Sequence, residues 1–485
     1  MTPFILIAAM IAASGDSGSC RKVPGLDANA LLRRAAARTG LPRSGDSVLA
    51  VSGYDVRDHA FESDRMYPPS LEEVVKIEEW FDPATAVERT VSHSTLGGYE
   101  FDGQTLGDAH ASYVVRDTSL IPSEETHAGL YQMRPLNVWA MLDDWLASSD
   151  ARVEGACDYR DYPRIVLSRH GPRGTERLFL DPKSGYPTKL DRVEPHYLWG
   201  QVHVEFVYST WQRIGSAHYP GASFRVEDGN TVVSRAYGAR RFVARDSAPS
   251  MRLPGRAGDM AMATPAFLAQ TRPDTIRVSA TTFVLRNRGY AETVALMRDT
   301  VFVFDATQGE ERVRQDSAWI GRLFPGRHPI VVVVTDLAWP HVAGVRAWVA
   351  RGATIVSHRA ARDFLTQVVN RRWTLAPDQL ERERGRVALH FRAVDQVLDL
   401  AGGDIRVFAI DGAASEVALA AFVAPDRFLW ASDFIQDLGS PTQYVDEVVA
   451  AVRRVGVSPT RVAAEHTPLG GWERVVSLAE HAQVP

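Results

Sequence analysis

The spacing of apolar residues changes along this chain, and in its first part apolar and polar positions alternate. In VHVEFVY, residues 202–208, the valines at even positions and the phenylalanine lie on one side of an extended chain, while His203 and Glu205 lie on the other. Such alternation is typical of antiparallel strands with one covered face. We therefore predict a large antiparallel β-rich sheet of the α+β type at 23–245, with a helix at 26–39. The same pattern, or a strand composition, recurs at 48–52, 74–81, 164–168 and 178–180.

From residue 276 onward, strand-like and helix-like segments follow one another instead. The run VVVVT at 331–335 is apolar and β-branched, which predicts a fully buried strand, and the following HVAGVRAWVARG has helical spacing up to Gly352. This order predicts a second domain at 276–485, joined to the first by a linker at 246–275 that is rich in Pro, Gly, Ala, Met and Arg. Further strands are predicted at 276–285, 300–304, 354–357 and within 389–410, and helices at 312–323, 359–369 and 441–455.

The composition suits two or three domains rather than one. With 485 residues, of which 45% are hydrophobic, the chain exceeds the size of an ordinary single core. Its formal net charge is −5 and its Lys and Arg residues form no run, which argues against nucleic acid or an anionic membrane surface as the main partner. The expected partner is a small-molecule or lipid-like ligand, and the sequence leaves the substrate and the oligomeric state open.

An apolar stretch at 4–13, FILIAAMIAA, is followed by the small residues Ser14, Gly15 and Ser17. This arrangement is typical of the core and cleavage region of a secretory signal, although the start of the chain lacks the usual basic residue. The stretch is too short to span a bilayer. We therefore predict a signal segment at 1–22, export to a periplasmic or extracellular compartment, and no integral membrane segment in the mature chain. A buried amino-terminal segment is the alternative.

The sequence contains two cysteines, Cys20 and Cys157. Two cysteines cannot form a disulfide framework, and no Cys/His spacing typical of a zinc finger is present. A lipidated Cys20 is not favoured, because Ser17 stands where a lipidation motif has a bulky aliphatic residue. If a signal is cleaved before Cys20, a Cys20–Cys157 disulfide is an open alternative, but the sequence does not favour it.

The loop after the buried strand carries the most informative motif. Residues 335–344, TDLAWPHVAG, resemble the signature Thr-His-x-His-x-Asp-His-x-x-Gly of the metallo-β-lactamase (MBL) fold superfamily, with His341 at the last of its four ligand positions. Asp433 matches the family's aspartate after a strand, turn and strand, and His466 in VAAEHTPLGG is placed like its final histidine. The resemblance covers about 276–482. It implies an αββα sandwich and hydrolysis of an ester, thioester or amide.

Most of that family's metal ligands are replaced in this chain. In the intact family, three histidines hold one zinc ion, and a set of aspartate and histidine residues holds a second. The three-histidine half has become Asp336, Ala338 and Ala414, and Pro340 replaces a further aspartate. Because alanine side chains coordinate nothing, a dinuclear zinc centre is not expected.

What the resemblance leaves is one mononuclear site. It would be formed by His341, His466, Asp433 and Asp336, and would hold a single zinc ion or, less favoured, iron. Asp433 or Asp336 would orient the attacking water and are the expected catalytic residues. The alternative is a metal-free, catalytically silent pseudoenzyme that binds a lipid-like or apolar ligand, and the sequence does not decide between the two.

The first domain carries a resemblance of its own. The segments LFLDPKSGYPTKLDR at 178–192 and VKIEEWFDP at 75–83 resemble strands and a hairpin of the curved half-barrel of periplasmic lipoprotein carriers. In that family the concave face holds acyl chains, which is why the binding-protein hypothesis names a lipid-like ligand. A plain packing or docking domain is the alternative, because any antiparallel hairpin can use an Asp-Pro-x-x-Gly turn.

Overall fold

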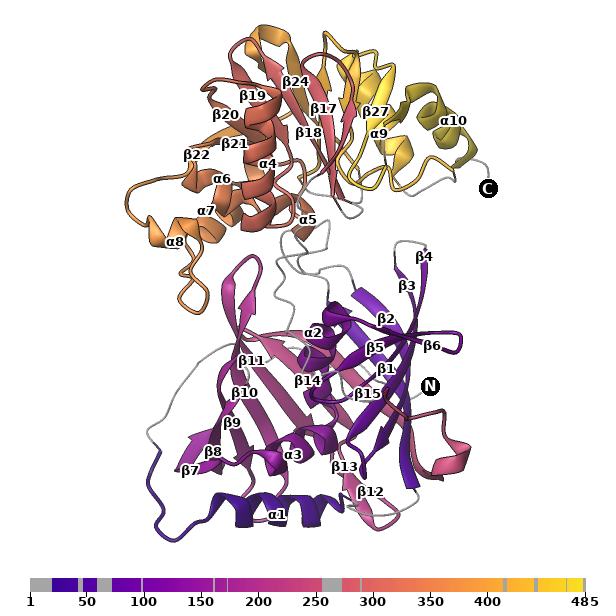
Figure 1. Ribbon diagram of the computed structural model, residues 1–485, viewed down its shortest axis with the longest axis vertical. Coiled ribbons are helices and arrows are strands. Elements are labelled where there is room, and N and C mark those ends of the chain that lie inside the picture. Colours follow the sequence, from indigo (N-terminus) through magenta and orange to yellow (C-terminus); the bar gives the residue numbers. More distant parts are fainter. Residues whose placement is uncertain are drawn as a thin grey trace. The chain divides into compact units, whose positions relative to one another are not determined.

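The structure is a computed structural model, and its described residues form two compact units (Figure 1). The first unit contains the described residues before 255, except 196–201, which belong to the second unit together with the residues from 273 onward. Most of the predicted signal and most of the predicted linker lie outside the described residues. The description covers 20–482 apart from 42–46, 59–71, 97–98, 160–161, 172, 255–272, 288–289, 413–416, 440–443 and 468.

Helix α1 (Ala28–Thr39) opens the first unit, where the amphipathic pattern predicts a helix. Asp27 caps its start, because its Oδ1 accepts a hydrogen bond from the backbone N–H of Ala30 at 2.6 Å. The helix ends at Gly40, whose φ of 70° is a left-handed conformation that glycine adopts without strain. The prediction of a helix at 26–39 is therefore confirmed apart from its first residues.

One sheet of 13 strands makes up most of the first unit. Its order is β6-β5-β4-β3-β2-β1-β15-β14-β11-β10-β9-β8-β7, and neighbours run antiparallel, as β1 does with β2 and β15. The predicted strands at 48–52, 74–81, 164–168, 178–180 and 202–208 lie in β1, β2, β8, β9 and β11, so these predictions are confirmed. The strands are β1 (Ser47–Asp58), β2 (Glu72–Asp82), β3 (Val87–Leu96), β4 (Tyr99–Gly107), β5 (Ser112–Arg116), β6 (Ser119–Pro122), β7 (Arg152–Tyr159), β8 (Tyr162–Gly171), β9 (Gly174–Leu180), β10 (Pro187–His196), β11 (Gly200–Ser209), β14 (Ala222–Glu227) and β15 (Asn230–Ala244), with a separate hairpin of β12 (Gln212–Ile214) and β13 (Ala217–Tyr219).

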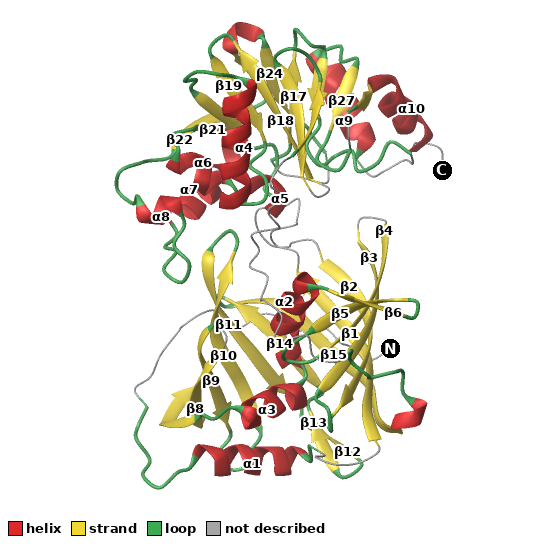
Figure 2. Ribbon diagram, viewed as in Figure 1, coloured by secondary structure: helices red, strands yellow, loops and turns green. Residues whose placement is uncertain are grey.

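A helical segment covers one face of this sheet, and the strands curve around it (Figure 2). The hydroxyl groups of Tyr208 and Tyr237 donate hydrogen bonds of 2.7 Å to the carbonyl oxygens of Pro135 and Leu136. These buried bonds tie the segment to strands β11 and β15. The segment consists of α2 (Glu124–Met133), the short helix η1 (Arg134–Leu136) and α3 (Val138–Ala147).

Paired charges line the covered face of the sheet. Arg235 on β15 lies 2.7 Å from Asp55 on β1, and Arg225 on β14 lies 2.9 Å from Glu194 on β10. Burial by itself would raise the pKa of Glu194, but Arg192 and Arg225 outweigh burial and lower this pKa to about 2. The face that the sequence alternation marks as covered is therefore partly built from ion pairs.

The second unit contains two sheets. The first has seven strands in the order β16-β17-β18-β19-β20-β21-β22, and β19 to β22 run parallel. The second has six, in the order β23-β24-β25-β26-β27-β28. The strands of the first sheet are β16 (Asp274–Arg277), β17 (Thr282–Asn287), β18 (Tyr290–Met297), β19 (Thr300–Phe304), β20 (Ile330–Val333), β21 (Thr354–His358) and β22 (His390–Val394). Those of the second are β23 (Val397–Leu400), β24 (Ile405–Ala409), β25 (Leu419–Val423), β26 (Phe428–Trp430), β27 (Arg461–Ala463) and β28 (Gly470–Gly471).

Helices flank these sheets in the second unit (Figure 1). Among the described residues of the chain, no helix is long and apolar enough to cross a bilayer. The helices are α4 (Glu310–Leu323), α5 (Trp339–Val342), α6 (Val345–Ala350), α7 (Arg362–Asn370), α8 (Gln379–Arg382), α9 (Val445–Val455) and α10 (Trp472–Ala482).

Three apolar clusters separate the layers of the second unit. In the first, Val303 of β19 and Trp348 of α6 pack together, so helices cover the outer face of the first sheet. In the second, Phe304 of β19 and Trp430 of β26 fill the space between the sheets. In the third, Leu429 of β26 packs with residues of α9 and α10. Because neighbouring residues of a strand face opposite sides, these clusters give the αββα order that the sequence predicts.

Two predicted elements of this unit differ in detail. The single strand predicted at 276–285 is two strands, β16 and β17, which pair across a tight turn. The helix predicted after the buried strand is divided into α5 and α6, so His341 lies within a short helix rather than at the end of a loop. The buried strand itself is confirmed as β20, and Thr335 lies just beyond it.

Candidate metal centre

Polar residues meet at the carboxyl ends of four strands of the second unit. Asp305 follows β19, Asp336 follows β20, Asp433 follows β26, and Glu465 follows β27. Within each sheet the two strands concerned are parallel neighbours. Their carboxyl ends therefore lie at the same edge, which is where ligands bind in α/β sheets. His341 reaches this edge from α5.

Three side chains form the centre of the cluster: His341, Asp433 and Glu465. One donor atom of each lies within 4.8 Å of the others, and His341 Nε2 is 3.2 Å from Glu465 Oε2. His466 adjoins them, with its Nε2 3.5 Å from Asp433 Oδ1 and 3.6 Å from Glu465 Oε2. The side chains of His341 and Glu465 are fully buried, whereas those of Asp433 and His466 are about one-third exposed. The cluster therefore has a buried inner side and a solvent-accessible outer side.

Asp305 fixes the orientation of His341. Its Oδ2 lies 3.0 Å from His341 Nδ1. The same carboxylate accepts hydrogen bonds from the backbone N–H and the hydroxyl group of Thr335, at 2.8 and 2.7 Å, and from the indole N–H of Trp430 at 2.8 Å. A carboxylate on one imidazole nitrogen directs the other nitrogen, here Nε2, toward Glu465. Asp305 is therefore a positioning residue of the site.

Carboxyl groups outnumber cationic groups in this cluster. Burial by itself would lower the pKa of His341, but Glu465 and Asp305 outweigh burial and raise this pKa well above its usual value. The pKa of Asp433 is also raised well above its usual value, first by burial and then by the negative charges of Glu465 and Asp336. Two imidazoles, those of His341 and His466, thus stand among four carboxyl groups, and the site favours an added positive charge, whether protons or a metal ion.

One carboxylate oxygen of the cluster lacks a hydrogen-bond partner among the described residues. The ring nitrogens of His341 already contact Asp305 and Glu465, at 3.0 and 3.2 Å, whereas Glu465 Oε1 is buried and no described residue donates to it. Imidazole and carboxylate are the donors that protein zinc and iron sites use. The residues present therefore fit one divalent cation.

The structure brings together three of the four metal ligands expected from the sequence. His341 and Asp433 share the cluster, and His466 lies beside it with its ring 5.1 Å from the ring of Tyr290. Asp336 is buried, and its Oδ1 accepts a hydrogen bond of 2.7 Å from its own loop, at the backbone N–H of Ala338. Asp336 therefore acts on Asp433 through its charge, and is not one of the three clustered residues.

Sequence reasoning missed two residues of this site. Glu465 immediately precedes His466 at the end of β27, and an acidic residue next to a loop histidine was the signal that could have shown it. Asp305 lies between Phe304 and Ala306 just after β19, and its role depends on Thr335 and Trp430, which are distant in sequence. Ala414, at a lost histidine position, lies outside the described residues.

The first unit contains a cavity of about 580 Å³ between the helical segment and the sheet. This volume is in the range of small-molecule sites. Its walls carry Arg134, Arg169 and Arg192 together with Asp144 and Glu176. These groups already pair with one another, as Arg134 does with Asp144 at 3.1 Å. The lining combines these charged groups with apolar residues such as Pro135, Met141 and Leu190, so only part of it has the apolar character that the binding hypothesis expects for a lipid-like ligand.

A comparison with protein-family models finds no match, and a comparison with curated proteins finds none either. Solved structures similar to this chain include the DIM-1 metallo-β-lactamase exposed to ceftazidime, with 16% identity, coverage of 44% of this chain and 98% of the other, and a TM-score of 0.34. Another is the mono-zinc form of FIM-1 from Pseudomonas aeruginosa, with 13% identity, coverage of 44% and 97%, and a TM-score of 0.34. A third is a metallo-β-lactamase from Pontibacter korlensis, with 12% identity, coverage of 44% and 100%, and a TM-score of 0.33.

TM-scores and sequence identities this low show nothing about activity. The αββα order of the second unit is based on the strands and apolar clusters of the chain itself. The similarity covers less than half of the chain. The resemblance of the first unit to lipoprotein carriers finds no support in these comparisons.

Proposed function

We propose that the second unit is an MBL-like hydrolase domain that holds a single divalent cation, zinc before iron. His341, Asp433 and Glu465 would be its ligands, and His466 a further donor. The substrate class follows from the sequence resemblance and is an ester, a thioester or an amide. One observation carries the proposal: the donor atoms of His341, Asp433 and Glu465 converge at the carboxyl ends of parallel strands, and the buried Oε1 of Glu465 has no hydrogen-bond partner among the described residues.

The residues of the chain would divide the chemistry between them. When bound, a divalent cation supplies a Lewis acid that polarises a carbonyl group. Asp433 is partly exposed, so its carboxylate suits the role of orienting an attacking water and accepting the proton that the water gives up. Asp336 would add a second negative charge near Asp433. Asp305 keeps the imidazole of His341 in place.

A catalytically silent binding protein is the second candidate, and one observation favours it. The imidazole of His341 lies between two buried carboxylates, at 3.0 Å from Asp305 and 3.2 Å from Glu465. A protonated imidazole in this position compensates part of the negative charge without any metal ion. In that case the ligand would be bound by a cleft that no longer carries out hydrolysis.

Metal content separates the two candidates. The chain is purified without a histidine tag, and its zinc and iron are measured by plasma mass spectrometry after dialysis against a weak chelator. The metallohydrolase proposal expects about one equivalent per chain, and a loss of most of it in Glu465→Gln and Asp433→Asn. Glu473→Gln, on the exposed side of α10, is the matched control and is expected to keep the metal. If the folded wild-type chain binds no cation, the metallohydrolase proposal is wrong and the silent binding protein remains.

A further inference from the structure

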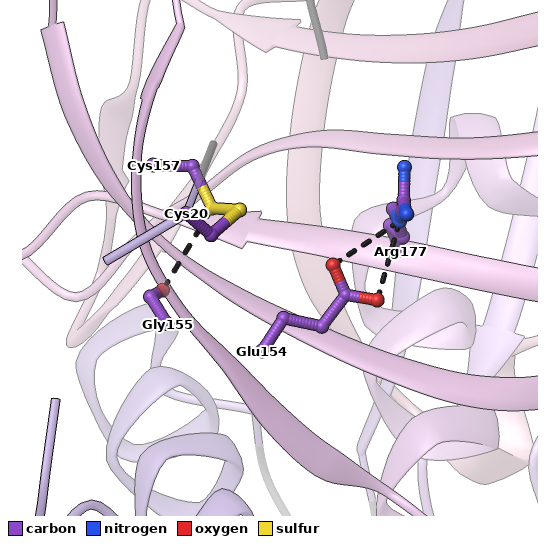
Figure 3. Close-up of a disulfide and its surroundings, with 5 residues drawn as sticks. All are labelled: Cys20, Glu154, Gly155, Cys157 and Arg177. Atoms are coloured by element: carbon purple, nitrogen blue, oxygen red, sulfur yellow. Dashed lines mark hydrogen bonds and ion pairs between the residues drawn. A yellow bond between two sulfur atoms is a disulfide. The ribbon is translucent and has the colours of Figure 1, made fainter. Parts of the chain in front are cut away.

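The amino-terminal end of the described chain pairs with an edge strand of the large sheet. Strand β7 is the last strand of that sheet. Arg21 forms an antiparallel bridge with Ala156 on β7, in which each backbone N–H donates to the other residue's carbonyl oxygen at 2.8 Å. Next to this bridge, Cys20 and Cys157 form a disulfide, shown in Figure 3. The sequence left this disulfide open without favouring it. The structure contains it, so a cleaved signal segment would have to end before Cys20 and not at residue 22 as predicted.

The residues around the disulfide are suited to this close approach. Gly155 has a φ of 147°, and a Cβ atom there would lie only 2.4 Å from the carbonyl oxygen of Arg21. Any larger residue at 155 would therefore push the amino-terminal segment away from β7. Cys157 is buried and packs in an apolar cluster with Val166 and Phe179. Glycine at 155 and the apolar cluster around Cys157 are observations separate from the disulfide itself, and both accommodate it.

We propose that the sulfur atom of Cys20 is committed to this structural disulfide and not to a lipid anchor, and that the chain reaches its final state in an oxidising compartment. A thioether to a diacylglycerol group would use the Sγ atom of Cys20, which is already bonded to the Sγ atom of Cys157. The two modifications therefore exclude each other. Structural disulfides form and persist in exported proteins and are rare where thioredoxin and glutathione keep thiols reduced.

Formation of the bond requires an oxidising partner of defined chemical class. The Cys20 and Cys157 thiols together lose two protons and two electrons. The electrons pass by thiol–disulfide exchange to a protein disulfide, whose S–S bond breaks to give two thiols. The new bond closes a segment with a sequence separation of 137, and it keeps the edge of β7 covered by the amino-terminal segment.

The experiment determines the chemical state of both cysteines. The full chain is produced in a bacterial host with its own leader, denatured in N-ethylmaleimide without a reductant, and mapped by peptide mass spectrometry. The expected result is no maleimide at either position and one cross-linked peptide containing Cys20 and Cys157, which separates into two labelled peptides only after reduction. Two maleimide-labelled cysteines, or a diacylglycerol thioether at Cys20, would overturn the proposal.

Cysteine variants show whether the bond also supports the fold. Cys20→Ala, Cys157→Ala and the double variant are expected to lower the thermal midpoint by nearly the same amount, because any one change removes the whole cross-link and alanine adds no polar group to the apolar cluster around Cys157. Reduced wild-type chain is expected to match them. Additive shifts of the two single variants, or a double variant as stable as the oxidised wild type, would show that the sulfur atoms act separately and would overturn the proposal.

Discussion

Asp305→Asn tests directly how the candidate site is held together. The carboxylate of Asp305 is fully buried, accepts hydrogen bonds from Thr335 and from the indole of Trp430, and lies 3.0 Å from His341 Nδ1. Asparagine has nearly the same volume but carries no charge, and its NH₂ group donates where the carboxylate accepts. The substitution therefore removes the charge and an acceptor without opening a cavity.

The expected loss of stability follows from these contacts. A hydrogen bond to a charged group contributes about 1.5–3 kcal/mol, and removing one partner of a buried ion pair costs about 3–5 kcal/mol. Because one carboxylate makes all the contacts, these values do not add. Since His341 keeps Glu465 as a partner at 3.2 Å, we expect the free energy of unfolding to fall by about 3 kcal/mol. Asp399→Asn is the matched control: its pair with Arg406 is partly exposed, and its loss is expected to cost less than about 1 kcal/mol.

Hydrogen–deuterium exchange read by mass spectrometry is the appropriate assay. The chain has two compact units, so one denaturation curve does not isolate the second unit, whereas the amides of β19 and β20 report on it alone. Faster exchange in these strands for Asp305→Asn, and unchanged exchange for Asp399→Asn, is expected. The role assigned to Asp305 would be refuted if the amides of these strands exchanged at the same rate in the two variants and the wild type. It would also be refuted if the two variants lost protection to the same extent.

Four further predictions concern buried charges and the disulfide. Burial raises the pKa of Glu88 to about 8, so the free energy of unfolding should fall as pH rises from about 4.5 to 8. Glu88→Gln should remove this fall in urea titrations, and a variant with the same pH profile as the wild type would contradict the prediction. The pKa of Glu194 is lowered to about 2, so its contribution is present above about pH 4.5 and is lost as pH falls toward 2, a dependence that Glu194→Gln should abolish in the same titrations. Closure of a segment with a sequence separation of 137 predicts that Cys20→Ser lowers the free energy of unfolding by about 5 kcal/mol, and a loss near zero in denaturant would contradict this entropic argument. Arg346→Met leaves the buried carboxylate of Asp378 without its cation and should cost about 3–5 kcal/mol, read from hydrogen–deuterium exchange in the second unit, and part of this loss should be restored by Asp378→Leu in the same chain.

Much of the secondary structure was predictable because it depends on local patterns. Alternation of apolar and polar residues placed five strands of the first unit, and the β-branched run after residue 330 placed β20. The helix α1 followed from its apolar spacing and from Gly40. Boundaries were less certain, because the turn that splits 276–285 into β16 and β17 and the break between α5 and α6 depend on packing against neighbouring strands.

Part of the candidate site was also readable from the sequence. An alanine at position 338 cannot bind a metal ion in any fold, and His341 was named because the resemblance to the MBL signature places it at a ligand position. Glu465 and Asp305 were not found, since their roles depend on which side chains face one another at the ends of strands that are distant in sequence. Asp336 was expected to be a ligand, but its carboxylate turns toward its own loop, which only a backbone conformation determines.

The amino-acid sequence by itself determined the strand and helix pattern of both halves and the absence of most histidine ligands, because periodicity and residue chemistry are local properties. The tertiary structure alone decided that Cys20 reaches Cys157, that arginines and carboxylates pair beneath the helical segment, and that Glu465 completes the cluster around His341. Each of these depends on a distance between residues far apart in the chain. Such a distance is set by strand order and register, which no short segment of sequence encodes.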